Sequence, residues 1–157
     1  MKKLNIRFDR EKCVTCKRCV IQCAVAHSES KDLAGALLEE PAPESRVRVK
    51  LDDKGRVTVT RCMHCENPKC VGACEAGALT KPGPGEAVEY NVDLCTGCMK
   101  CVEACPFGAI RPSNGGKTVI KSDLCAERVA GGGLPACVEA CATGALDVRE
   151  PASTCKK

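Results

Sequence analysis

Cysteines are the residues of this chain that can do chemistry. Fifteen of the sixteen cysteines fall into four spaced sets: Cys13, Cys16, Cys19 and Cys23; Cys62, Cys65, Cys70 and Cys74; Cys95, Cys98, Cys101 and Cys105; and Cys125, Cys137 and Cys141. The third set has the spacing C-x2-C-x2-C-x3-C and is followed by proline, which is the run that binds [4Fe–4S] clusters in bacterial ferredoxins. The pattern therefore predicts iron–sulfur clusters, and it leaves the fourth set one ligand short.

The last cysteine of each set predicts how the clusters share their ligands. In two-cluster ferredoxins the fourth cysteine of a run ligates the other cluster. By that rule the second and third sets exchange a ligand, and so do the first and fourth. The expected ligand groups are Cys13, Cys16, Cys19 with Cys141; Cys62, Cys65, Cys70 with Cys105; Cys95, Cys98, Cys101 with Cys74; and Cys125, Cys137 with Cys23. We therefore expect four clusters in two close pairs, an arrangement that suits electron hopping.

Structural zinc is the alternative use of so many cysteines. Zinc sites are usually built from two CxxC pairs that lie a dozen or more residues apart. Triplets that are each followed by a fourth cysteine match that spacing poorly. A zinc-stabilised interaction module stays open as a function of a different class, and a brown colour after anaerobic purification would exclude it. A radical-cofactor enzyme is a weaker alternative, because the chain is too short for the barrel of such enzymes.

Composition also points to clusters in place of a conventional core. The 157 residues include no Trp, one Tyr (Tyr90) and two Phe (Phe8 and Phe107), although aromatic side chains usually dominate core burial. The formal net charge of +4 counts no thiolates. Four clusters held by fifteen thiolates would bring the charge to about −3, so the basic residues do not indicate a nucleic-acid partner.

The amino-terminal residues and the hydropathy pattern bear on location. No apolar segment precedes the first cysteine, no twin arginine is present, and no stretch reaches the length of a membrane span. We expect a cytoplasmic protein without a membrane span, in a compartment that keeps thiols reduced.

Three internal repeats organise the chain into an α+β fold. The motif V-x-A-C-x-x-G-A-[LI] begins at Val71, Val102 and Val138, and each copy predicts a short helical turn, a glycine stop and the start of a strand. A hairpin is predicted from residues 46–51 and 56–60, with returning strands at 88–90 and 118–120. A helix is expected at roughly 30–40.

These elements predict a duplicated, bacterial dicluster-ferredoxin-like fold with short strands and helices around the clusters. Residues 1–60 and 117–148 are expected to form an outer unit, which carries the first and fourth cysteine sets and an insertion at 24–60. Residues 61–116 are expected to form an inner unit with the second and third sets. Residues 149–157 are expected to be a tail.

Several motifs resemble those of a known family. The segments are Cys23-Ala24-Val25-Ala26-His27-Ser28, Met63-His64-Cys65 with Asn67-Pro68, and Leu134-Pro135-Ala136-Cys137. With them, residues 8–148 resemble the four-cluster ferredoxin-like electron-transfer subunits of the DMSO reductase and formate hydrogenlyase type. The chain looks most similar to the ferredoxin-like partners of anaerobic carbon monoxide dehydrogenase and tungsten aldehyde oxidoreductase.

The resemblance implies an electron-transfer subunit of an anaerobic oxidoreductase complex, without catalysis of its own. It implies a hetero-oligomer with carbon monoxide dehydrogenase as the favoured catalytic partner. The electron acceptor would be a flavin-dependent NAD(P) reductase or a hydrogenase. A tungsten aldehyde oxidoreductase or a formate dehydrogenase is the alternative catalytic partner.

Ser122 is the main departure from the family pattern. The fourth set of such proteins usually reads Lys-Cys-Asp-Leu-Cys, whereas this chain has serine in place of the first cysteine. Three outcomes are possible at this corner of the cluster. Ser122 could ligate iron through its oxygen, or Cys155 could fold back from the tail to replace the missing thiolate. The corner could also lack a protein ligand, in which case it is either open, giving a [3Fe–4S] cluster, or filled by an external ligand. We expect three [4Fe–4S] clusters and a fourth cluster with altered ligation, while His27 and His64 serve as polar neighbours of the loops.

Overall fold

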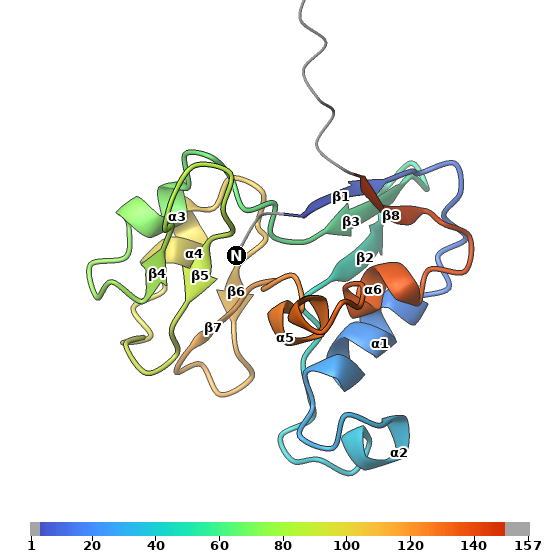
Figure 1. Ribbon diagram of the computed structural model, residues 1–157, viewed down its shortest axis with the longest axis horizontal. Coiled ribbons are helices and arrows are strands. Elements are labelled where there is room, and N and C mark those ends of the chain that lie inside the picture. The colour runs from blue at the N-terminus through green and yellow to red at the C-terminus, as the bar shows by residue number, and fades with distance from the viewer. Residues whose placement is uncertain (1–3, 150–157) are drawn as a thin grey trace, which may run out of the picture.

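The computed structural model describes residues 4–149, and these form short helices and strands joined by many loops (Figure 1). The expected mixture of helices and strands is confirmed. The helices are α1 (Arg18–Ala26), α2 (Leu33–Ala36), α3 (Lys69–Gly72), α4 (Lys100–Ala104), α5 (Ala126–Ala130) and α6 (Ala136–Glu139). The strands are β1 (Asn5–Phe8), β2 (Arg48–Leu51), β3 (Val57–Thr60), β4 (Leu79–Thr80), β5 (Glu89–Tyr90), β6 (Arg111–Pro112), β7 (Val119–Ile120) and β8 (Leu146–Arg149).

The strands pair as antiparallel ribbons that fall into two units. Strands β4 and β5 pair, as do β6 and β7, and helix α3 packs against α4 beside them; we call this the inner unit. Strand β1 pairs with β8, β2 pairs with β3, and α1 packs against α6; together with α5 these form the outer unit. Figure 1 shows the two units side by side, with α2 projecting from the outer one.

Each unit has its own small core, and cysteines belong to both. The outer core buries Ile6, Val47, Leu124 and Leu146 together with Cys23 and Cys137. The inner core buries Leu79, Val88, Ile110 and Val119 together with Cys70 and Cys101. The thiols therefore lie where aromatic side chains would stand in an ordinary domain, as the composition suggested.

The repeated motif has the same local structure in all three copies. Gly77, Gly108 and Gly144 have φ angles of 67°, 56° and 65°, which is the left-handed conformation that suits glycine. Each of these glycines donates its N–H to the carbonyl oxygen of the last cysteine of its set, at 3.0–3.1 Å. The chain then enters a strand with a buried Ala-Leu or Ala-Ile pair. The predicted turn, glycine stop and strand start are confirmed.

The hairpin expected at 46–60 is confirmed, but the helix expected at 30–40 is reduced to the single turn α2. Strands β2 and β3 pair across a turn at Asp52–Gly55. Helix α2 begins after Asp32, whose carboxylate accepts the N–H of Gly35 at 2.9 Å. The Glu39 carboxylate then accepts hydrogen bonds from Glu29 and Ser30, so it draws the chain back after one turn.

The boundaries of the two units differ slightly from the expected ones. Strand β7 lies within 117–148 but pairs with β6 of the inner unit, so the chain enters the outer unit only after Ile120. Arg149 pairs with Asn5 and so continues β8 into the segment expected to be tail. Cys155 and the rest of that segment lie outside the described residues.

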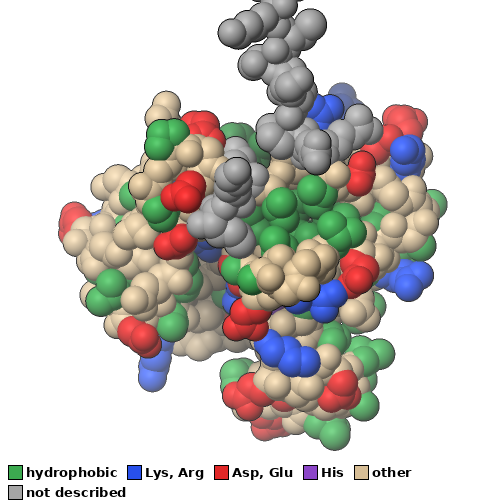
Figure 2. Space-filling model, viewed as in Figure 1, with side chains coloured by type: hydrophobic (Ala, Val, Ile, Leu, Met, Phe, Trp, Pro, Cys, Tyr) green, Lys and Arg blue, Asp and Glu red, His purple; other side chains and the backbone are tan. Residues whose placement is uncertain are grey.

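The surface and helix lengths add two observations. On the face drawn in Figure 2, basic and acidic side chains are interspersed rather than gathered into one basic stripe. Within residues 4–149 no helix has the length and apolar character needed to cross a membrane.

Candidate metal centres

One backbone feature is common to all four cysteine loops. The residue two positions after the first expected ligand (Cys13, Cys62, Cys95 or Ser122) has a positive φ angle: 55° at Thr15, 48° at His64, 69° at Gly97 and 62° at Leu124. L-residues adopt this conformation rarely, because the Cβ atom approaches the following carbonyl oxygen. Its recurrence means that the loop of the fourth set has the same turn as the three complete sets. Ser122 therefore has the backbone position of Cys13, Cys62 and Cys95.

The thiols of the first loop lie near the last cysteine of the fourth set. Burial raises the pKa of the Cys19 thiol, and the neighbouring thiols of Cys141, Cys13 and Cys16 raise it further. Burial also opposes ionisation of Cys141, but its sulfur accepts the Leu146 N–H at 3.3 Å, and the net effect lowers its pKa. The structure thus brings together the four residues expected to form the first ligand group.

The thiols of the second loop gather in the same way with the last cysteine of the third set. Burial raises the pKa of Cys70 to about 11, with added effects of Cys62 and Cys105. Burial also raises the pKa of Cys62, and the neighbouring thiols of Cys65 and Cys105 act in the same direction. Mutual repulsion of this kind is expected where several thiolates converge without a cation between them.

The third loop completes the exchange between the second and third sets. Burial raises the pKa of Cys101, and the thiols of Cys74, Cys95 and Cys98 act in the same direction. Cys98 is exposed, as is Cys16 at the same position of the first loop, whereas the equivalent residues of the other two loops are half-buried (Cys65) and buried (Cys125).

The fourth group has three thiols. Burial raises the pKa of Cys137 to about 12, and its neighbours Cys23 and Cys125 add to the effect. Cys23 is also buried, but a hydrogen bond from His27, the charge of His27 and the N–H of Arg46 at 3.2 Å outweigh burial and lower its pKa.

Ser122 stands at the first ligand position of the fourth loop, with its side chain oriented as the thiol of Cys62 is. Its Oγ accepts the N–H of Leu124, two residues ahead, at 3.3 Å. In the second loop the N–H of His64, also two residues ahead, bonds to the Cys62 thiol. Ser122 and Cys62 are both buried, at 8% and 6% exposure. The serine oxygen therefore lies where a cysteine sulfur would lie.

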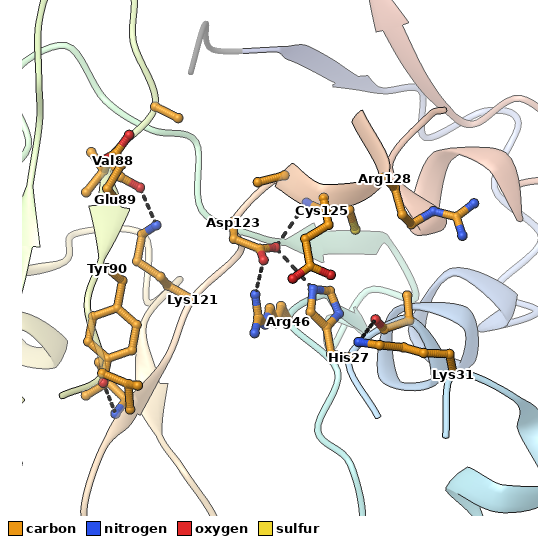
Figure 3. Close-up of a pocket in the computed structure, with 16 residues that line it drawn as sticks. His27, Lys31, Arg46, Val88, Glu89, Tyr90, Lys121, Asp123, Cys125 and Arg128 are labelled. Atoms are coloured by element: carbon orange, nitrogen blue, oxygen red, sulfur yellow. Dashed lines mark hydrogen bonds and ion pairs between the residues drawn. The ribbon is translucent and has the colours of Figure 1, made fainter. Parts of the chain in front are cut away.

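A charged triad lies behind the fourth loop, as Figure 3 shows. The Nε2 of His27 lies 3.1 Å from Asp123 Oδ1, and Arg46 pairs with the other carboxylate oxygen. Nδ1 of His27 is 2.6 Å from the carbonyl oxygen of Cys23. Burial opposes the charged imidazole, but the hydrogen bonds to Asp123, Cys125 and Cys23 together outweigh it and raise the pKa of His27 to about 11. With both nitrogens donating, His27 acts as a polar neighbour and not as an iron ligand.

Asp123 also shapes the fourth loop directly. Its Oδ1 accepts the N–H of Cys125 at 3.0 Å. Burial would raise the pKa of this carboxyl, but His27 and Arg46 outweigh it and hold the pKa well below its usual range. A cavity of about 700 Å³ opens here between the units, lined by residues that include Lys121, Asp123 and Cys125 (Figure 3).

His64 has a structural position in the second loop. It is 1% exposed, and its Nδ1 accepts the N–H of Val88 at 2.9 Å. The imidazole therefore joins the second loop to the segment that leads into β5.

Two cations near the loops escaped the sequence-based reasoning. Arg61 and Lys121 stand directly before Cys62 and Ser122, and Lys121 is 3% exposed. Their shared position before a first ligand was the signal that could have identified them.

The donor set fits iron–sulfur clusters. All fifteen cysteines of the described residues are free thiols. One cysteine of each expected group lies beside other members of that group, namely Cys19, Cys70, Cys101 and Cys137. Soft thiolate ligands select iron–sulfur clusters or zinc. Ligands that come from two different loops, as Cys105 does for Cys62 and Cys70, follow the dicluster ferredoxin pattern.

Comparison with known proteins decides between these metals. A family model described as "4Fe-4S dicluster domain" matches residues 54–150, and a second one described as "4Fe-4S binding domain" matches residues 10–26. This chain belongs to the 4Fe-4S dicluster domain family. It is an iron–sulfur electron-transfer protein and not itself a catalytic enzyme.

Three relatives illustrate the family. YsaA of Escherichia coli (strain K12), which is named as an electron transport protein, is 39% identical over 88% of this chain and 84% of its own length. Protein NrfC of the same strain is 33% identical over 88% of this chain and 61% of its own length. A tetrathionate reductase subunit of Salmonella typhimurium is 33% identical over 93% of this chain. The chain spans 61% of NrfC and 58% of the tetrathionate reductase subunit, so it covers only about three fifths of these two longer relatives.

Proposed function

We propose that this chain relays single electrons through four iron–sulfur clusters, between a catalytic oxidoreductase subunit and an electron acceptor. Bound clusters would supply one-electron carriers whose potentials depend on ligand type, charge and hydrogen bonding. The observation that carries the proposal is the convergence of thiols from paired loops, as with Cys19 and Cys141 or Cys101 and Cys74. The chain itself contributes ligands, burial and the spacing between them.

The proposed ligand groups are the four expected from the exchange rule, with Ser122 as the fourth donor beside Cys23, Cys125 and Cys137. The positions of these residues also suggest an order. The first and third loops have exposed cysteines, Cys16 and Cys98, which suits the two ends of a relay. The second and fourth loops have no exposed cysteine, which suits an internal junction between the units.

We propose that the fourth cluster is retained with altered ligation, and that Ser122 fills the corner. The support is the inward orientation of its oxygen, which accepts the Leu124 N–H as the Cys62 thiol accepts the His64 N–H. An open corner with a [3Fe–4S] cluster is the second candidate. It is favoured by the cavity beside Cys125, through which the iron of an unligated corner could be lost to solvent.

Anaerobic purification followed by iron analysis and EPR tests both statements. Four clusters predict about sixteen iron atoms per chain, or about fifteen with one [3Fe–4S] cluster. The oxidised protein should be EPR-silent if Ser122 ligates iron, and a [3Fe–4S] signal that Ser122→Cys abolishes would support the open corner. A colourless protein that binds zinc instead would contradict the proposed relay.

The catalytic partner is proposed only as a class, an oxidoreductase subunit in a hetero-oligomer. The motif resemblance favours carbon monoxide dehydrogenase, with tungsten aldehyde oxidoreductase or formate dehydrogenase as alternatives. The acceptor is proposed to be a flavin-dependent NAD(P) reductase or a hydrogenase. Two relatives are named for a hydrogenase-2 operon and for tetrathionate reductase, so their names widen this choice. Anaerobic co-purification from the native host would identify the partner.

A cytoplasmic location is part of the proposal. Its support is the chemistry of the ligands, because a reducing compartment preserves free thiolates for metal binding.

A further inference from the structure

Two cations occupy equivalent places in the second and fourth loops. Arg61 directly precedes Cys62, and Lys121 directly precedes Ser122. At the same position of the first and third loops stand Lys12 and Leu94, both of which are exposed. Lys121 is buried and Arg61 is partly buried, so the cations turned inward belong to the two loops that have no exposed cysteine.

Each cation binds its own loop and the opposite unit. The Arg61 guanidinium donates to the carbonyl oxygen of Cys62 at 3.2 Å and to that of Ile6 in strand β1 of the outer unit. The Lys121 ammonium donates to the carbonyl oxygen of Ser122 at 2.9 Å and to that of Val88 at 2.6 Å, next to β5 of the inner unit. Figure 3 shows Lys121 reaching across to Val88. The two contacts are therefore reciprocal.

The electrostatic surroundings of the two cations are reciprocal as well. Burial lowers the pKa of Arg61, and the thiols that favour its charge are Cys137 of the outer unit and Cys62 of the inner unit. Burial also lowers the pKa of Lys121, while Cys62, Asp123 and Cys70 favour its charge. Asp123 is itself paired with His27 and Arg46. Much of the positive charge of both cations is thus left to face the thiols of the second and fourth groups.

The hydrogen bonds described above go to neutral carbonyl oxygens, which hold the cations in place without cancelling their charge. A fixed positive charge in a poorly solvated site interacts more strongly with a nearby negative charge than the same charge does in water. Adding an electron makes a thiolate-bound cluster more negative, so a nearby cation favours its reduced form.

We propose that Arg61 and Lys121 are a reciprocal pair of positioning residues that raise the reduction potentials of the two internal clusters and join the two units. This inference rests on the proposed relay. Arg61 faces thiols of both internal groups, so its charge acts on both clusters. Lys121 faces Cys62 and Cys70, so its charge acts mainly on the cluster of the second group.

EPR-monitored redox titration of the anaerobically purified holoprotein tests the proposal. Arg61→Gln should lower two midpoint potentials, each by about a tenfold change in the reduction equilibrium, which is about 59 mV for one electron. Lys121→Gln should lower mainly one potential by a similar factor. Arg61→Lys keeps the charge and should restore the potentials to within about twofold of the wild type.

Lys54→Gln is the matched control, because it removes one exposed positive charge from the turn between β2 and β3. Solvent screening should keep its effect below about twofold at every cluster. If Arg61→Gln does not assemble, Lys121→Met retains an unbranched stem and gives the same measurement on the other cation.

Two outcomes separate this inference from the proposed relay. Wild-type protein without iron–sulfur clusters would contradict the relay itself. Fully loaded variants whose potentials shift no more than those of Lys54→Gln would overturn the role of the cations and leave the relay intact.

Discussion

The second and fourth cysteine loops have the same backbone turn and an inward cation at the same position, yet they differ in the atom at the first ligand position. In the second loop the donor is the sulfur of Cys62, and in the fourth it is the oxygen of Ser122. Both donors are buried, and each accepts the N–H two residues ahead. The turn therefore does not depend on the thiol.

The surroundings of the two loops differ more than their backbones do. At the residue after the first donor, the second loop has the exposed Met63 and the fourth has Asp123, which binds His27 and Arg46. The fourth loop thus combines the oxygen of Ser122 at its first position with charged side chains that the second loop lacks at the matching residue. The comparison indicates that charged side chains help to stabilise the loop conformation where a thiolate is absent.

Removing the iron should have the largest effect, because it removes what both loops bind. The described core is poor in aromatic side chains, and ligands such as Cys70 and Cys137 are part of it. Structural metal binding is worth about 10 kcal/mol or more in small domains. We expect chelation after oxidation to abolish cooperative thermal unfolding, followed by far-UV circular dichroism. A chelated protein that still unfolds cooperatively would show that the core is sufficient alone.

Exchanging the first donors should make each loop a copy of the other. Ser122→Cys should give the fourth site four thiolates and raise its potential by about tenfold in the reduction equilibrium, or about 59 mV, because an alkoxide oxygen is a harder donor than a thiolate and favours the oxidised iron. Cys62→Ser should shift the second site in the opposite direction. Redox titration with EPR measures both, and potentials that do not respond to either exchange would mean that these residues are not ligands.

Gly97→Ala tests how closely the shared turn is packed in a complete loop. Gly97 has a φ angle of 69°, and an added Cβ would lie 2.6 Å from the carbonyl oxygen of Lys117. We expect a loss of about 2–3 kcal/mol in the free energy of unfolding. Gly115→Ala is the control, because an added Cβ meets nothing within 4 Å there. Denaturant titration of the holoproteins compares them, and equal stabilities would contradict the close approach.

Asp123→Asn should have the smallest effect of the four and should fall on the fourth loop alone. The substitution weakens the contacts with His27 and Arg46 but keeps an oxygen for the N–H of Cys125. We expect a loss of about 1–2 kcal/mol in the free energy of unfolding. Met63→Ala at the matching position of the second loop should change it by less than about 0.5 kcal/mol. Similar losses in both variants would remove the distinction between the scaffolds.

Local features of the fold could be predicted from the sequence. The hairpin of β2 and β3 followed from alternating residues around a turn, and the three V-x-A-C-x-x-G-A-[LI] copies predicted where each glycine ends a helical turn. The pairing of β1 with β8 was missed, because it joins residues more than 130 positions apart and no local pattern encodes it. The short length of α2 was also missed, since it depends on Glu39 folding back onto Ser30.

In the candidate site, too, local features could be predicted from the sequence and long-range contacts could not. Cysteine spacing alone predicted that the chain binds iron–sulfur clusters and made zinc a poor match, because ligand geometry around a cluster restricts spacing to a few residues. Only the tertiary structure decided that the Ser122 oxygen points inward and that His27 is a donor to Asp123. It alone also decided that Arg61 and Lys121 each reach the opposite unit. Short-range spacing is encoded in neighbouring residues, whereas the position of a buried charge depends on which distant strands meet around it.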